Sequence, residues 1–304
     1  MAVKEILTQE EHYELVKACP YRLLSHDPVY ASKIAERLGA YKLLHVSVGC
    51  EEYILPLAIA NNKAVSFSPL WAGGILPLNR HDHILEAIDE IRKYIKKNYP
   101  KYTNVTMMIP NFMPFYESLS SLPVTNFQLG AYADVDMPYA DYWNNTYTNK
   151  SRNMVRKADK LFTYRLFDRN DYLTDIYEIN TSKPIRQGPM SEGYLEQPKA
   201  SSNKLSNYAT YQQEFVGAFK DGKLVAYINA LVCGRIYIFN QILGHNNYLK
   251  DGVMNGLVDY AVKLGCNSGR VKYLYYVHFG NPKIDMFRKT VGFKPVNHVN
   301  MVVL

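Results

Sequence analysis

The sequence predicts an α/β (α+β) protein of two tandem units, each a mixed, mainly antiparallel sheet flanked by helices. The main observation is a weak internal repeat, because the order of expected elements in residues 42–122 recurs about 170 residues later in residues 214–293. A chain of 304 residues has room for two ordinary domains, and both halves contain enough apolar residues for a core. We expect domains at 1–138 and 139–304, packed together because no Gly/Ser-rich linker separates them.

The first copy opens with three expected strands, at residues 43–48, 53–60 and 64–68. A helix over residues 83–98 follows, since apolar residues recur at spacings of three and four and form one stripe: Ile84, Ile88, Ile91 and Ile95. A strand at 104–109 and a short amphipathic helix at 112–122 complete this copy.

The second copy repeats that order. It has expected strands at 214–219, 224–233 and 235–243, a helix at 252–264, a strand at 271–277 and a helix at 282–290. The first two strands are separated by Asp221 and Gly222, and an Asp-Gly pair between two apolar runs is a strong hairpin signal.

The composition favours an anionic partner and a cytoplasmic location. The formal net charge of +7 suits a nucleotide, a nucleic acid, a phosphate-bearing substrate or a membrane surface. The four cysteines form no Cys-x-x-Cys pair, which argues against a zinc site or a disulfide framework. The amino terminus lacks the apolar core of a signal peptide, and we expect no transmembrane segment.

The final residues of the second copy resemble a known fold. The segment Phe287-Arg288-Lys289-Thr290-Val291-Gly292-Phe293-Lys294-Pro295 looks like the closing helix, Gly-Phe and strand of the GNAT acyltransferases, whose two central strands splay apart around an acyl donor. The duplicated order is similar to the Fem-type aminoacyltransferases, which form peptidoglycan cross-bridges, and to related tandem-GNAT proteins. The resemblance implies two tandem GNAT-like domains and transfer of an acyl or aminoacyl group to an amine.

One departure from the GNAT pattern concerns the donor. Coenzyme A-dependent members carry Gln/Arg-x-x-Gly-x-Gly/Ala before the long helix, where backbone amides hold the pyrophosphate. Residues 244–252 lack this glycine spacing, Asp251 adds a negative charge there, and residues 68–77 of the first copy also lack the motif. We therefore expect no permanently bound cofactor and an aminoacyl-tRNA donor, with acyl-CoA as the alternative.

Three cationic positions match the Fem-type pattern in sequence order. Lys33 and Arg186 resemble the residues with which such enzymes hold the diphosphate of a nucleotide-linked acceptor. Phe287 and Arg288 resemble their carboxy-terminal Phe-Lys pair, with arginine in place of lysine. A guanidinium can stabilise an oxyanion but stays charged and cannot readily transfer a proton. Lys33, Arg186 and Phe287 are thus candidate substrate-binding residues and Arg288 is the candidate catalytic residue; the alternative is that each charge is merely solvated.

A further basic cluster lies at residues 149–160. On a helix Arg152 and Arg156 share one face at a spacing of four, which suits contact with tRNA or an anionic acceptor; a solvated helix face is the alternative. Residues 182–205, rich in Pro, Gly, Ser and Lys, predict a long loop of the kind that often covers a binding site.

The sequence leaves three functional hypotheses. The first is a Fem/GNAT-type N-acyltransferase that modifies a cell-wall or polysaccharide precursor. The second is an acyl-CoA-dependent GNAT N-acetyltransferase. The third is a non-catalytic tandem-GNAT module that binds an anionic ligand or a nucleic acid. No serine or cysteine triad is evident in the sequence, which is compatible with direct transfer, and no metal site is expected.

Overall fold

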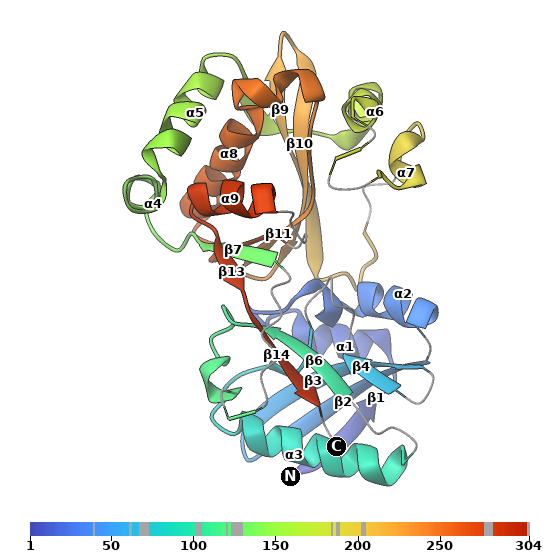
Figure 1. Cartoon of the computed structure of the whole chain (residues 1–304). Helices are drawn as coiled ribbons and strands as arrows, with labels where there is room; N and C mark the ends of the chain where they lie inside the picture. The colour runs from blue at the N-terminus through green and yellow to red at the C-terminus, as the bar shows by residue number, and fades with distance from the viewer. Residues whose placement is uncertain are drawn as a thin grey trace.

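The computed structural model describes residues 1–38, 40–60, 63–66, 73–100, 105–119, 121–122, 130–183, 185–186, 189–201, 205–276 and 282–302. These residues form two seven-stranded sheets, which lie one above the other in Figure 1, each with its own helices. The predicted fold class is confirmed.

The first unit has the strand order β1-β2-β3-β4-β6-β14, with β5 paired to β3. Its strands are β1 (Ala2–Ile6), β2 (Ala40–Val48), β3 (Glu51–Ala60), β4 (Lys63–Ser66), β5 (Leu76–Pro77), β6 (Val105–Pro110) and β14 (His298–Val302). Its helices are α1 (Gln9–Val16), η1 (Leu24–His26), α2 (Pro28–Leu38), α3 (Ile84–Asn98) and η2 (Glu117–Leu119). The four isoleucines of the predicted stripe are all buried on α3.

The second unit has the strand order β13-β7-β12-β11-β10-β9-β8. Its strands are β7 (Gly130–Asp134), β8 (Thr163–Leu166), β9 (Tyr211–Lys220), β10 (Lys223–Cys233), β11 (Ile236–Gly244), β12 (Tyr273–Tyr276) and β13 (Lys294–Val296). Its helices are α4 (Tyr139–Thr146), α5 (Asn149–Asp159), η3 (Arg169–Tyr172), α6 (Leu173–Thr181), α7 (Glu192–Leu195), η4 (Asn246–Asp251), α8 (Val253–Ser268) and α9 (Pro282–Thr290).

The internal repeat predicted from the sequence is present. In each unit three strands pair antiparallel in turn, a long helix follows, and the next strand pairs parallel to the third: β2-β3-β4-α3-β6 and β9-β10-β11-α8-β12. The expected hairpin turn joins β9 to β10, with left-handed backbone at both Asp221 and Gly222.

One predicted element is wrong. Of the predicted helix at 112–122, residues 112–119 form turns and the short η2 instead. Pro114 disfavours helical backbone at the preceding Met113, and the side chains of Phe112, Met113 and Phe115 are buried from these turns.

The two units exchange strands. β7 precedes residue 138 in the chain, yet it pairs with β12 and β13 of the second sheet. β14 ends the described chain, yet it pairs with β6 of the first sheet. Figure 1 shows β13 and β14 as one path that runs from the second unit into the first. The expected boundary at Pro138 remains a prediction about domains, and strand pairing crosses it in both directions.

The two units also share a hydrophobic core. One of the two main clusters contains α3 and the first sheet, and it extends to residues of the second sheet: Leu231, Cys233, Ile236, Ile238, Tyr273, Tyr275 and Val296. This end of the second sheet is therefore covered by the first unit.

A buried carboxylate fastens the junction between the units. Asp27, which is fully buried, precedes α2, and its Oδ1 accepts from the amides of Val29 (3.0 Å) and Tyr30 (2.8 Å). Its Oδ2 accepts from the amide (2.5 Å) and the hydroxyl (3.0 Å) of Thr210, just before β9. Arg22 donates to the carbonyl of the same threonine at 2.9 Å.

We predict that Asp27→Ala lowers the free energy of unfolding by about 2 to 4 kcal/mol, because three partly buried amides lose their acceptor. Urea denaturation measures the change. Asp82→Ala is the control, since Asp82 forms only an exposed ion pair with Arg80 and should cost less than about 1 kcal/mol. Equal losses in the two variants would contradict a junction role for Asp27.

A buried imidazole supports the chain before α3. His26 of η1 accepts from the amide of Leu23 through Nδ1 at 3.0 Å, which leaves Nε2 to donate to the carbonyl of Gly74 at 3.0 Å. Burial lowers the pKa of His26 to about 4, so the folded protein holds this ring neutral.

This shift predicts acid sensitivity. Between pH 6.5 and 4 the unfolded chain binds a proton at His26 more readily than the folded chain does, so stability is complete above about pH 6.5 and falls as the pH decreases. We expect the wild type to lose about 2 kcal/mol more than His26→Gln between pH 7 and pH 5, by urea denaturation at both values. Parallel pH profiles for the two proteins would refute this assignment.

Candidate functional site

β11 of the second sheet contains a bulge. β11 and β12 pair in parallel from Ile236 with Tyr273 to Phe239 with Tyr276, the last described residue of β12. At the next position, Asn240, β11 contains the bulge, because Asn229 of β10 is opposite Gln241 while Ala230 is opposite Phe239. Beyond this bulge, β11 continues to Gly244 paired with β10 in the described chain. A bulge bends its strand, so β11 bends at the position where its described pairing with β12 ends.

The sheet face opposite α8 changes character near this bulge. At one end Tyr227 packs with α6, and at the other end Leu231 packs into the core of the first unit. Between them lie three amide side chains on neighbouring strands, Gln213, Asn229 and Gln241, which we call the polar band. Gln213 Nε2 donates to Asn229 Oδ1 at 2.9 Å.

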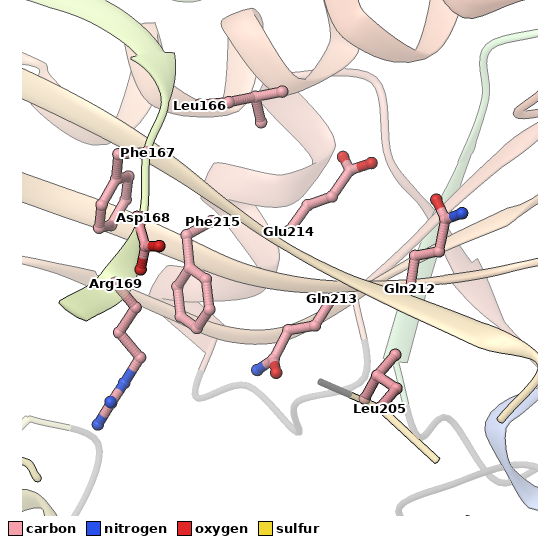
Figure 2. A pocket seen from close by; sticks show the side chains of 9 residues that line it. All are labelled: Leu166, Phe167, Asp168, Arg169, Leu205, Gln212, Gln213, Glu214 and Phe215. Atoms are coloured by element: carbon pink, nitrogen blue, oxygen red, sulfur yellow. The ribbon is translucent and has the colours of Figure 1, made fainter. Parts of the chain in front are cut away.

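Two cavities open beside the polar band. The larger, of about 540 Å³, lies against β8 and β9 (Figure 2), and its lining is Leu166, Phe167, Asp168, Arg169, Leu205, Gln212, Gln213, Glu214 and Phe215. The smaller, of about 250 Å³, lies under α6 and α7 and is lined by Arg169, Ile176, Asn180, Ser191, Gly193, Tyr194, Pro198, Phe215, Tyr227 and Gln241. Arg169 and Phe215 line both cavities, so we treat the two as one cleft.

Residues 189–201, which we call the strap, close one side of the cleft. The strap is held by the start of η3: Arg169 Nη1 donates to the carbonyl of Lys199 at 2.8 Å. Asn170 and Ser201 exchange two hydrogen bonds, Nδ2 to the serine carbonyl at 3.0 Å and the serine amide to Oδ1 at 3.1 Å. The strap belongs to the long loop that the sequence predicted as a cover.

The cleft is polar but contains little acid–base chemistry. Tyr227 donates to Asn180 Oδ1 at 2.9 Å, and burial raises the pKa of this tyrosine well above its usual range. Glu214 forms an ion pair with Arg270 at 2.5 Å. The described lining contains neither histidine nor cysteine. The arrangement therefore suits binding and orientation of a ligand more than covalent catalysis.

Arg186 lies near the end of β11 and is half-buried. Its guanidinium donates to the carbonyls of Gly244 (3.1 Å) and Ile179 (2.8 Å) and to Ser182 Oγ (3.3 Å). Burial lowers the pKa of Arg186 from its usual value. This residue joins the end of α6 to the end of β11, so it has a structural role whether or not it binds a ligand.

Arg288 and Phe287 lie on α9 and pack on the α8 face of the second sheet. Phe287 contacts the α8-side core, and Arg288 forms an ion pair with Asp285 and lies over the Tyr276 ring, 5.2 Å from its centre. Arg288 is only 5% exposed. Arg186, in contrast, is bonded to α6 on the opposite face.

The remaining predicted cations lie elsewhere. Lys33 is exposed on α2 of the first unit. Arg152 and Arg156 lie on α5 as predicted, and Arg156 is placed over the Trp143 ring at 5.7 Å. Neither cavity of the cleft is lined by any of the predicted site residues. Convergence of Lys33, Arg186 and Arg288 on one anion site therefore stays a prediction.

The start of α8 is covered by α5. A Cβ added to Gly252 would lie 3.0 Å from both the side chain and the carbonyl oxygen of Met154, so the two helices are in close contact. Lys157 Nζ donates to the carbonyl of Lys250 (3.1 Å) and pairs with Asp251 (2.9 Å). The corresponding segment of the first unit, residues 67–72, lies outside the described residues.

The described residues contain neither a metal-binding cluster nor a membrane-spanning helix. No group of three or more His, Cys, Asp or Glu side chains there is arranged to hold a metal ion. In the same part of the chain, no helix has the length and hydrophobicity that a membrane crossing requires.

Comparison with solved structures identifies proteins of the same architecture. FemX superposes with a TM-score of 0.69 at 11% identity and covers 99% of this chain and 97% of its own. The C-terminal domain of a putative lysylphosphatidylglycerol synthetase from Agrobacterium fabrum gives 0.56 at 11% identity, covering 98% and 93%. L-PGS from Bacillus licheniformis gives 0.53 at 14% identity, covering 96% and 90%.

No family model matches the chain, and no curated protein matches its sequence. At these identities the structural similarity concerns the fold. Together with the duplicated sheets, it confirms the resemblance inferred from the sequence: the chain has the same tandem fold as FemX.

Proposed function

We propose that the protein is an N-acyltransferase of the Fem/GNAT type, which transfers an aminoacyl or acyl group to an amine and forms an amide. The observation that carries this proposal is the bulge of β11 at Asn240, which lies where the described pairing of β11 with β12 ends and directly beside the polar cleft. Beyond the bulge, one edge of β11 offers backbone groups that no described strand uses. Such groups can bind an acyl carbonyl and its developing oxyanion while the cleft presents the amine.

We propose aminoacyl-tRNA as the donor. The close packing of α5 on the start of α8, and the Lys157–Asp251 ion pair beside it, argue against a pyrophosphate held by the amides of that helix. The exposed basic side chains of α5, Lys150 and Arg156, are suited to an RNA backbone. Arg152, on the same helix, is assigned to the same contact.

We propose an anionic acceptor, with Lys33 and Arg186 holding a diphosphate or a comparable group and Phe287 contacting the substrate. FemX and the two lysylphosphatidylglycerol synthetases among the neighbours support an acceptor from a cell-wall or polysaccharide precursor, or one at a membrane surface. A cytoplasmic location is part of this proposal.

The donor hypothesis predicts that acetyl-CoA does not stabilise the protein, whereas charged tRNA does, since a ligand that binds only the folded state raises the melting temperature. Differential scanning fluorimetry and calorimetric titration test it, with uncharged tRNA as the control for backbone contacts. Tight, saturable acetyl-CoA binding would favour the CoA-dependent acetyltransferase. Binding of RNA without transfer to any amine would favour the non-catalytic module.

The role proposed for Arg288 predicts that Arg288→Ala lowers kcat by about 30- to 1,000-fold, equivalent to about 2 to 4 kcal/mol of barrier, with a smaller change in KM. Arg288→Lys should retain part of the rate because it keeps the charge.

The double variant Arg288→Ala/Asp285→Ala separates this role from a packing role, because it also removes the carboxylate that pairs with the arginine. A double variant that regains the wild-type rate would show that Arg288 acts only by neutralising Asp285.

A further inference from the structure

We infer that Arg169 binds an oxyanion, a carboxylate or a phosphate monoester, and that the attached chain lies along the polar band toward the β11 bulge. No described or predicted site residue has this role. The inference rests on the proposed function only in calling this ligand the acyl acceptor; the binding site itself is argued from the cleft.

The guanidinium of Arg169 carries a positive charge that can hold an anion. Within the described chain no carboxylate forms an ion pair with this guanidinium, and its hydrogen bonds go to the Lys199 carbonyl and, at 3.5 Å, to Ser201 Oγ. Both bonds use Nη1, and among the described residues none bonds the Nε and Nη2 edge, which can therefore hold a ligand. A planar guanidinium holds carboxylates and phosphates through two parallel bonds.

Arg169 lies where the two cavities of the cleft meet. Arg169 is the one charged side chain shared by both cavities of the described cleft, so an anion there can connect to groups in either cavity. Phe215, which also lines both, provides an apolar wall next to it. In Figure 2 Arg169, Gln213 and Phe215 project to the same side of β9, while Glu214 projects to the other. Glu214 is thus directed away from the proposed anion, while Asp168, the other acidic side chain of this lining, accepts from the amide of Asn170 through Oδ1 at 2.9 Å.

The polar band consists of amide side chains on neighbouring strands. Amide side chains both donate and accept, so Gln213, Asn229 and Gln241 match a ligand that carries amides or hydroxyls. The band leads from β9 across β10 to Gln241, next to the bulge of β11. A ligand anchored by its anion at Arg169 would therefore present its far end, and an amine there, to the proposed transfer point.

The test is binding of small probes to the intact protein by isothermal titration calorimetry. The probes are a peptide carboxylate, N-acetyl-alanyl-alanine; its C-terminal amide; and glucose 1-phosphate. We expect one or both of the anionic probes to bind and the amide to bind at least about tenfold more weakly. Preference for the peptide or for the sugar phosphate then identifies the source of the oxyanion.

The variants are Arg169→Gln, which removes the charge, and Lys199→Ala, which removes an exposed charge of the same sign from the adjacent strap. Arg169→Gln should weaken anion binding at least about tenfold and Lys199→Ala less than about twofold. Unchanged melting temperatures show that loss of binding is not loss of folding. Inorganic phosphate serves as a further probe that has no attached chain. Gln213→Ala should weaken binding of the peptide but leave binding of inorganic phosphate unchanged.

Three results would overturn the inference: no binding of either anionic probe, binding of the peptide that its amide equals, or equal loss of anion binding in Arg169→Gln and Lys199→Ala. Failure of acyl transfer with intact anion binding would refute the proposed function and leave this site standing. If Arg169→Gln leaves both KM and kcat of acyl transfer unchanged, the acceptor site proposed at Arg169 is refuted and the proposed function stands.

Discussion

The exchange of β7 and β14 between the sheets is the constraint on which the rest of the structure depends. Each sheet is completed by a strand from the other half of the sequence, so neither unit can move far without breaking a ladder of backbone hydrogen bonds. The hydrogen bonds of Asp27 and the shared core also join the two units and hold them in the same relative position. The relative position of the units is therefore set by backbone pairing as well as by side-chain packing.

This arrangement determines where a ligand can bind. The first unit covers the apolar end of the second sheet, and α6 covers the other end. The polar band remains between them, beside the bulge of β11. The site is thus a property of the whole chain, although every residue of its described lining comes from the second unit.

Local patterns predicted the elements, while the pairing between distant strands and the cleft were not predictable in this way. The isoleucine stripe of α3 and the Asp221-Gly222 turn each carry their signal within a few residues. The exchange of β7 and β14 has no such signal, because the partner strands are far apart in sequence. Asn229 interrupts an otherwise apolar strand, and that interruption was the available clue to the polar band. The cations chosen by family resemblance lie outside the cleft, whereas Arg169 becomes evident only when η3, the strap and β9 are brought together.

The strand exchange also imposes an order on folding during synthesis. The ribosome releases β1 to β6 first, yet the first sheet lacks β14 until residues 298–302 have emerged. In the second sheet, by contrast, β7 is synthesised before its partner β12. The first unit is consequently synthesised first but completed last. Until β14 pairs with it, the outer edge of β6 is unpaired and can form hydrogen bonds with other unfolded chains.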